Sequence, residues 1–252
     1  MDRLADAVEL LDGPLDDPPT LAGNLRDLRR INRWLGGVRL SADAIDALAA
    51  HRDSLTVLDV GTGGADIPMA LLARADERGR GVSVVGIDSR PEVLTAAVIA
   101  TPAVAATSGL ELHVGDGRSL PYGDGSFDVV HSSLLIHHLS ERETVILLRE
   151  MARVARLGVV VNDLDRTRLG WIGAWLIGHL LTGNRYTRSD APLSVLRSYR
   201  AGETRALLRA AGLTPVRTIR GSFGQRYAIA AVPTPREVEE WATPPDPQGA
   251  GK

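Results

Sequence analysis

The sequence predicts an α/β protein with a mostly parallel β-sheet. Short apolar runs alternate with helix-length segments along the chain, and this alternation is typical of strand–helix–strand units joined by right-handed crossovers. A glycine-rich turn follows the first run, as in α/β folds that bind nucleotide-like ligands at the carboxyl ends of their strands. The predicted strands are 55–60, 82–87, 110–114, 127–131, 157–161, 214–219 and 227–232, and the predicted helices among them are 66–78, 91–103, 141–153 and 201–211.

Composition and charge narrow the class of protein. The chain has 252 residues, enough for one sizeable domain, with 44% apolar residues and a formal net charge of −2. This charge provides no general attraction to nucleic acid. Cysteine is absent, which excludes disulfides, thiolate metal sites and cysteine nucleophiles and fits a cytoplasmic protein. No segment has the ~18 continuous apolar residues of a membrane span, and the first residues do not resemble a signal peptide.

Residues 1–53 are expected to form an N-terminal helical cap. Apolar residues at positions 4, 8 and 11 predict a short first helix, which a proline-rich segment ends. Leucines and isoleucine at helical spacing, with arginines between them, predict a second helix over 21–35. Ser41 is a suitable N-cap for a third helix that continues through Leu48.

The turn at residues 61–66 (GTGGAD) connects the first strand to a helix that begins near Asp66. Glycines allow a sharp turn and a close approach of the backbone to a ligand, and the helix N-terminus presents free N–H groups. A dinucleotide fingerprint has a third glycine or alanine where this chain has Asp66, and a carboxylate there would repel a pyrophosphate but accept a bond from an ammonium. The turn therefore indicates an amino acid attached to a nucleoside as ligand.

Acidic residues end the next two strands. Asp88 follows the second strand, where a carboxylate can accept hydrogen bonds from both ribose hydroxyls. Asp116 follows the third strand, at a position from which an adenine amino group could be bound.

Taken in this order, the turn and the two acids resemble the class I S-adenosylmethionine-dependent methyltransferases, in particular small-molecule enzymes of bacterial quinone and secondary metabolism. The resemblance covers about residues 55–165. It implies a Rossmann-like methyltransferase fold with a mostly parallel seven-stranded sheet, N-terminal helices and a helical insertion after the fifth strand. It also implies S-adenosyl-L-methionine as cofactor and S-adenosyl-L-homocysteine as product. The cofactor-binding residues that it implies are Asp59, Gly61, Thr62, Gly63, Gly64, Asp66, Asp88, Ser89, Asp116, Gly117, Arg118 and Ser132.

Two adjacent histidines, His137 and His138, follow the fourth strand and are the catalytic candidates. That segment lies at the carboxyl edge of the sheet, where open α/β folds bind their ligands. A neutral imidazole can take a phenolic or enolic proton near neutral pH. The other histidines form no ligand pattern such as His-x-x-x-His, so we expect no metal.

Residues 165–200 interrupt the alternation of strands and helices and are expected to determine the acceptor. An apolar helix there carries two tryptophans. It is expected to be a lid over the cleft, an interface in a homodimer or a further part of the core. These elements belong to a methyltransferase domain over 54–235, and residues 236–252 are expected to be a disordered tail. The expected substrate-binding residues are Arg29, Asn32, Asp163, Trp171, Trp175 and Tyr186.

These features favour methyl transfer to a small aromatic or polyketide-like metabolite, on oxygen or, as a close second, on carbon. The expected partners are then the acceptor and, if the apolar helix forms an interface, a second copy of the chain; neither nucleic acid nor a membrane is expected. A nicotinamide-dependent reductase is disfavoured by Asp66 and by the absence of any lysine before Lys252. A methyltransferase-like fold that binds S-adenosylmethionine without transferring its methyl group is the other alternative.

Overall fold

The computed structural model describes residues 1–15, 17–49 and 52–235, and its strands form a seven-stranded sheet. The strand order is β3-β2-β1-β4-β5-β7-β6, in which β7 is antiparallel to both neighbours and the other pairs are parallel. The prediction of a mostly parallel seven-stranded sheet is thus confirmed. The strands are β1 (Ser54–Val60), β2 (Gly81–Asp88), β3 (Leu110–Val114), β4 (Phe127–Ser133), β5 (Ala155–Leu164), β6 (Leu213–Arg220) and β7 (Arg226–Pro233).

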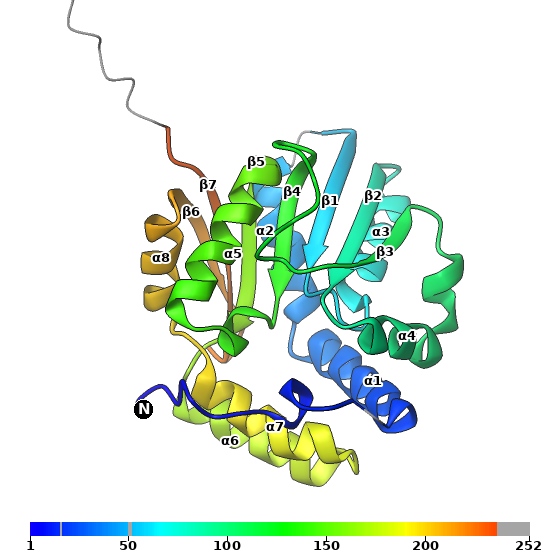
Figure 1. Ribbon diagram of the computed structural model, residues 1–252, viewed down its shortest axis with the longest axis vertical. Helices are drawn as coiled ribbons and strands as arrows, with labels where there is room; N and C mark the ends of the chain where they lie inside the picture. Colours follow the sequence, from blue (N-terminus) through cyan, green and yellow to red (C-terminus); the bar gives the residue numbers. More distant parts are fainter. Residues whose placement is uncertain (16, 50–51, 236–252) are drawn as a thin grey trace, which may run out of the picture.

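Helices cover both faces of the sheet (Figure 1), which explains why its central strands are continuous apolar runs. In β4, Val129 packs into the apolar cluster that includes α2 and α3, whereas Val130 packs into the cluster that includes α5 and α8. Both side chains are fully buried because successive residues of a strand point to opposite faces. The helices on the two faces are α2 (Gly37–Ala49) and α3 (Asp66–Glu77), and α5 (Glu141–Val154) and α8 (Ala201–Ala210).

A further layer lies across the carboxyl ends of the parallel strands (Figure 1). It consists of α1, α6, α7 and the N-terminal segment, and α1 also packs against α4 through a small apolar cluster. The bounds are α1 (Pro18–Trp34), α4 (Pro91–Ala100), α6 (Arg168–Leu176), a π-helical segment η4 (Ile177–Leu181) and α7 (Arg185–Arg197), with 3-10 turns η1 (Leu10–Asp12), η2 (Pro102–Ala106) and η3 (Ile136–His138).

The N-terminal segment corrects the sequence prediction of a first helix. Residues before Leu10 are extended or turn, and Val8 is 74% exposed, so the helical spacing of apolar residues there buries no common face. The segment is held by hydrogen bonds to α7 instead, because the backbone N–H groups of Leu10 and Leu11 donate to the two carboxylate oxygens of Asp190 at 3.0 Å. We call residues 1–12 the strap, because they cross the end of the sheet (Figure 1).

Two helix boundaries also differ from the prediction. α2 begins at Gly37, so Ser41 lies inside the helix and its hydroxyl bonds to His131 rather than capping the first turn. α4 ends at Ala100, where the chain continues as the 3-10 turn η2. The predicted disordered tail, 236–252, lies outside the described residues. In the described part of the chain, no helix is long and apolar enough to cross a membrane.

Candidate active site

The glycine-rich turn between β1 and α3 has the sharp geometry that its sequence predicts. Gly61 and Gly63 have φ values of +72° and +52°, in the left-handed region that favours glycine. A Cβ at Gly63 would meet no atom within 4 Å, so the backbone there borders open space. The N–H groups of Gly61 and Thr62 both donate to the Ile87 carbonyl, at 2.8 and 3.0 Å, which ties the turn to the end of β2.

Asp88 lies beside this turn at the end of β2. Its carboxylate accepts hydrogen bonds from the backbone N–H groups of Gly63 and Arg90, both at 3.1 Å. Burial raises the pKa of Asp88, while these two hydrogen bonds lower it. Both bonds come from the backbone, and the side chain is only partly buried, so the carboxylate retains lone pairs for a ligand hydroxyl.

Asp59 and Thr62 support the turn from beneath. The Asp59 carboxylate accepts a bond from the Thr62 hydroxyl at 2.8 Å and contacts His131 Nδ1 at 2.6 Å, while His131 Nε2 is 2.8 Å from the Ser41 hydroxyl. All four residues are buried. The side chains of Asp59 and Thr62 thus bond to each other, and Asp59 also bonds to His131; their contact with the cofactor stays a prediction.

Asp66 and Asn32 form a second polar group next to the turn. The Asn32 side-chain amide donates to Asp66 at 2.8 Å, and its carbonyl oxygen accepts from Arg226 at 2.6 Å. Burial raises the pKa of Asp66 and outweighs the lowering by the bond from Asn32. Asn32 therefore joins α1 to the turn, and its role in binding the acceptor stays a prediction.

The other expected cofactor residues divide by their surroundings. The Asp116 carboxylate is paired with Arg118 at 2.9 Å, and a Cβ at Gly117 would approach core atoms, including Leu147 Cδ1 at 2.7 Å. Ser89 is exposed, and a Cβ at Gly64 would lie 3.5 Å from Leu25 in α1. Ser132 is different, because its buried hydroxyl has no hydrogen-bond partner.

These residues fit an S-adenosylmethionine-like ligand better than a phosphate-containing one. Open space at Gly63, the acceptor carboxylate of Asp88 and the Asp66 carboxylate at the helix N-terminus suit hydroxyl and ammonium donors. Among the described residues no lysine is available for a phosphate at the turn, since Lys252 is the sole lysine of the chain.

We call the layer formed by α1, α6, α7 and the N-terminal strap the cap layer. A cavity of about 150 Å³ lies between the cap layer and the carboxyl ends of β4 and β5. Its wall is mostly apolar, with contributions from α1, α6, α7 and the strap. The segment after β4 contributes Leu134, His137 and His138. The polar side chains at its wall include Glu9, Asn24, His137, His138, Asp190, Ser194, Gln225 and Arg226.

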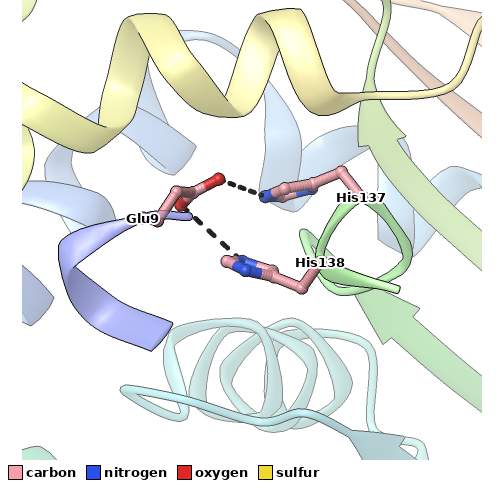
Figure 2. A group of neighbouring side chains, drawn as sticks. All are labelled: Glu9, His137 and His138. Atoms are coloured by element: carbon pink, nitrogen blue, oxygen red, sulfur yellow. Dashed lines mark ion pairs between the residues drawn. The ribbon is translucent and has the colours of Figure 1, made fainter. Parts of the chain in front are cut away.

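Glu9 of the strap faces both histidines of η3 (Figure 2). Its Oε1 is 3.9 Å from His137 Nε2, and its Oε2 is 3.9 Å from His138 Nε2. On the far side of each ring, Nδ1 contacts a carboxylate: Asp163 at 2.7 Å for His137 and Asp12 at 2.8 Å for His138. The structure thus brings together both predicted catalytic histidines and the predicted residue Asp163.

The charges around this group are unevenly compensated. Burial raises the pKa of Glu9 to about 7, although His138 and Arg197 lower it. Burial also acts to raise the pKa of Asp163, but the hydrogen bond and charge of His137 lower it below its usual value. Arg197, itself buried, lies 3.3 Å from Glu9 Oε1 and also pairs with Asp12.

Four of the expected substrate-binding residues lie outside the wall of this cavity, and their contact with the acceptor stays a prediction. Trp171 and Trp175 are 36% and 42% exposed on the outer face of α6, whereas Gly170, Gly173 and Ala174 of the same helix line the cavity. The other two are Tyr186, which is buried in the cluster between α1 and α4, and Arg29, which donates to the Thr101 hydroxyl at 2.9 Å outside the cavity.

Sequence reasoning missed the acidic and basic residues that complete the site. Glu9 is separated from His137 by more than a hundred residues, and no spacing rule connects them. Arg226 lies in what the sequence presents only as the start of a β-strand.

Comparisons with known proteins find similarity to methyltransferases. The family described as "Methyltransferase domain" matches residues 58–161. Demethylmenaquinone methyltransferase of Deinococcus radiodurans is 31% identical over 183 residues, covering 68% of this chain and 72% of that protein. Ajmaline N-methyltransferase of Rauvolfia serpentina is 34% identical over 109 residues, covering 43% of this chain and 35% of that protein. The chain spans less than half the length of the first curated relatives it matches.

A solved structure supports the fold. A SAM-dependent methyltransferase from Aquifex aeolicus superposes with a TM-score of 0.59 at 20% identity, and the match covers 85% of this chain and 97% of that one. At this identity the likeness shows the fold alone.

Proposed function

The chain belongs to the class I S-adenosylmethionine-dependent methyltransferases, and from that premise we propose that it methylates an oxygen of a small, largely apolar acceptor, aromatic or polyketide-like in character. The observation that carries the proposal is the mostly apolar cavity with the histidine pair in its wall. An apolar cavity with a few convergent polar groups is the usual form of a small-molecule site.

The cavity adjoins the cofactor turn through two shared elements. A Cβ at Gly61 would meet the Leu135 side chain at 3.0 Å, and Leu134 and His137 of the same segment line the cavity. Helix α1 likewise approaches the turn at its Leu25 and lines the cavity at Leu28 and Ile31. An acceptor in the cavity would therefore lie near a ligand at the turn, as methyl transfer requires.

S-adenosylmethionine, when bound, supplies an electrophilic methyl group on sulfur. Asp88 would hold its ribose hydroxyls, the backbone around Gly63 and the carboxylate of Asp66 its amino-acid part, and Ser132 has a free buried hydroxyl nearby on β4. The task of the chain is then orientation of the acceptor and exclusion of water.

The histidines would orient and activate the acceptor hydroxyl. Because each Nδ1 is hydrogen-bonded to a carboxylate, each ring is fixed and its Nε2 faces the cavity group around Glu9. The likeness to demethylmenaquinone methyltransferase supports an aromatic, quinone-like acceptor. The likeness to the ubiquinone/menaquinone biosynthesis C-methyltransferase of Geobacter, 32% identical over 109 residues, supports carbon as the methylated atom, so product analysis must distinguish oxygen from carbon.

The test is a screen of phenols and hydroquinones with methyl-labelled S-adenosylmethionine, with mass spectrometry of the product. In His137→Ala and His138→Ala, we expect turnover to fall by about 10²–10⁴-fold while S-adenosylmethionine affinity stays unchanged. His179→Ala is the matched control, because this histidine stacks on Trp175 and does not line the cavity. Undiminished turnover in both histidine variants would refute the assigned role, and the absence of any methylated product would refute the acceptor class.

A further inference from the structure

We propose that Glu9, His137 and His138 form a binding site for one divalent first-row transition-metal ion in the cavity wall. The use of this ion rests on the proposed function: its open coordination position would take the phenolate or enolate oxygen of the acceptor. Figure 2 shows the three side chains converging from the strap and from η3.

The spacing of the ligand atoms suits an ion better than direct hydrogen bonds. One atom from each residue can be chosen so that all three lie within 4.8 Å of one another. The two Nε2–carboxylate distances of 3.9 Å are too long for hydrogen bonds. Ligand atoms around one tetrahedral zinc ion lie roughly 3.3 Å apart, so a small closure of these side chains would complete the site.

The hydrogen bonds of the two rings direct the converging atoms at one another. Nδ1 of His137 contacts Asp163 and Nδ1 of His138 contacts Asp12, and a carboxylate accepts such a bond. Nε2 of each ring is then the atom that faces the Glu9 carboxylate. Glu9 is only 2% exposed, and its Oε1 makes no hydrogen bond, although it lies 3.3 Å from Arg197 Nη1. Two imidazole nitrogens and a carboxylate that face one another in a buried place are a suitable set of ligands for a metal cation.

Each ring also has the outer partner typical of a metal-bound histidine. Histidine ligands usually donate their second ring N–H to a carboxylate, which fixes the ring and makes the ligating nitrogen more basic. Here both histidines have such a carboxylate, one from β5 and one from η1.

The local charge favours a divalent ion over protons. Four carboxylates (Glu9, Asp12, Asp163 and Asp190) surround the histidines, while the cations that face them are Arg197 and Arg226. These carboxylates outnumber the arginines that face them. Two positive charges on the rings would repel each other, because the ring centroids are only 4.3 Å apart.

Three protein ligands of the two-nitrogen, one-oxygen type leave a position open, which is characteristic of catalytic rather than structural sites. All three residues line the cavity, so an acceptor oxygen could reach that position. An ion there would lower the pKa of the bound hydroxyl and so favour its oxyanion. The oxyanion is the form of oxygen that attacks a methyl sulfonium.

The test uses the full chain, stripped of metal with a chelator and titrated calorimetrically with Zn²⁺. We expect one site per chain with a dissociation constant of about 1 μM or below, and a loss of affinity of about 10–100-fold in Glu9→Gln and in His138→Gln. His113→Gln is the matched control, because it removes the exposed His113–Glu111 pair elsewhere on the surface. Circular dichroism checks that each variant folds, and His138, which is partly exposed, is the safer substitution.

The outcomes separate the site from the proposed function. No saturable Zn²⁺ binding, or binding as tight in both Glu9→Gln and His138→Gln as in the wild type, overturns the metal site whatever the activity. Methyl transfer that survives complete removal of metal overturns its role with the acceptor and leaves the proposed function standing. Site-specific binding without any methyl transfer supports the site and contradicts the function.

Discussion

Replacement of Arg226 by methionine should destabilise the protein severely, because this guanidinium joins four elements inside the fold. It donates to Asn162 on β5 at 2.7 Å, to Asn32 on α1 at 2.6 Å and to Ser133 on β4 at 2.9 Å. Arg226 is only 2% exposed. Burial lowers the pKa of Arg226 to about 10, against the opposing charges of Asp163 and Asp66, so the side chain remains charged at neutral pH.

The magnitude follows from what the methionine would leave behind. Three oxygen acceptors would lose a donor, and the Asp66 and Asp163 carboxylates would lose a buried countercharge. Removal of one partner from a buried ion pair costs about 3–5 kcal/mol, because the remaining charge stays uncompensated. Methionine has a similar length and fills much of the space, so a cavity adds little to this value.

The assay is urea denaturation followed by circular dichroism. We expect the free energy of unfolding of Arg226→Met to fall by about 3–5 kcal/mol with an unchanged dependence on urea concentration. Arg39→Met is the matched control, because Arg39 is 83% exposed and pairs with Asp43 one helical turn away. That variant should lose about 0.5 kcal/mol or less. Equal small losses in both variants would refute the assignment of Arg226 as the buried link between these elements.

Two further predictions concern the core and the pH dependence. Gly117→Ala should lower the free energy of unfolding by about 1–3 kcal/mol, since its Cβ would lie 2.5 Å from Val60. In the same denaturation assay Gly202→Ala, at an exposed position of α8, should be neutral or stabilising. For Asp128, burial acts to raise the pKa, but hydrogen bonds, among them one from Arg156, lower it below 3.8. The hydrogen bonds of the Asp128 carboxylate therefore stabilise the fold fully above pH 3.8 and are lost as pH falls through the lowered pKa. The difference in stability between wild type and Asp128→Asn should then shrink in denaturation curves below about pH 4. A constant difference would contradict this.

Most of the sheet could be predicted from the sequence because its strands are buried on both faces. Val129 and Val130 are adjacent and both fully buried, so β4 appears as a continuous apolar run that no surface element would have. The turn at Gly61 and Gly63 was equally clear, since its conformation restricts the residue type. The strand order and the antiparallel placement of β7 were not predicted, because the spacing of residues along the chain does not determine which strands pair.

The cap layer was predicted less well because helical spacing does not say which surface a helix buries. The two tryptophans of α6 have the spacing of a buried stripe, yet the structure exposes them and turns the small residues of α6 toward the cavity. The strap was missed for the same reason: Val8 has helical spacing with its neighbours but no helix forms around it. Glu9 acquires its meaning only from the tertiary fold, which carries it across the end of the sheet to His137 and His138.

The measurement that tests the central claim most directly is isothermal titration of the purified chain with S-adenosylmethionine, S-adenosylhomocysteine and NADPH. The account predicts saturable binding of the two sulfur ligands alone, weakened about 10–100-fold in Asp88→Ala through loss of its charge-assisted hydrogen bonds. Affinity should be unchanged in Asp124→Ala, where the carboxylate removed is 83% exposed. Binding of NADPH in place of the sulfur ligands, or sulfur-ligand affinity that does not respond to loss of Asp88, would contradict the assigned site and with it the proposed reaction.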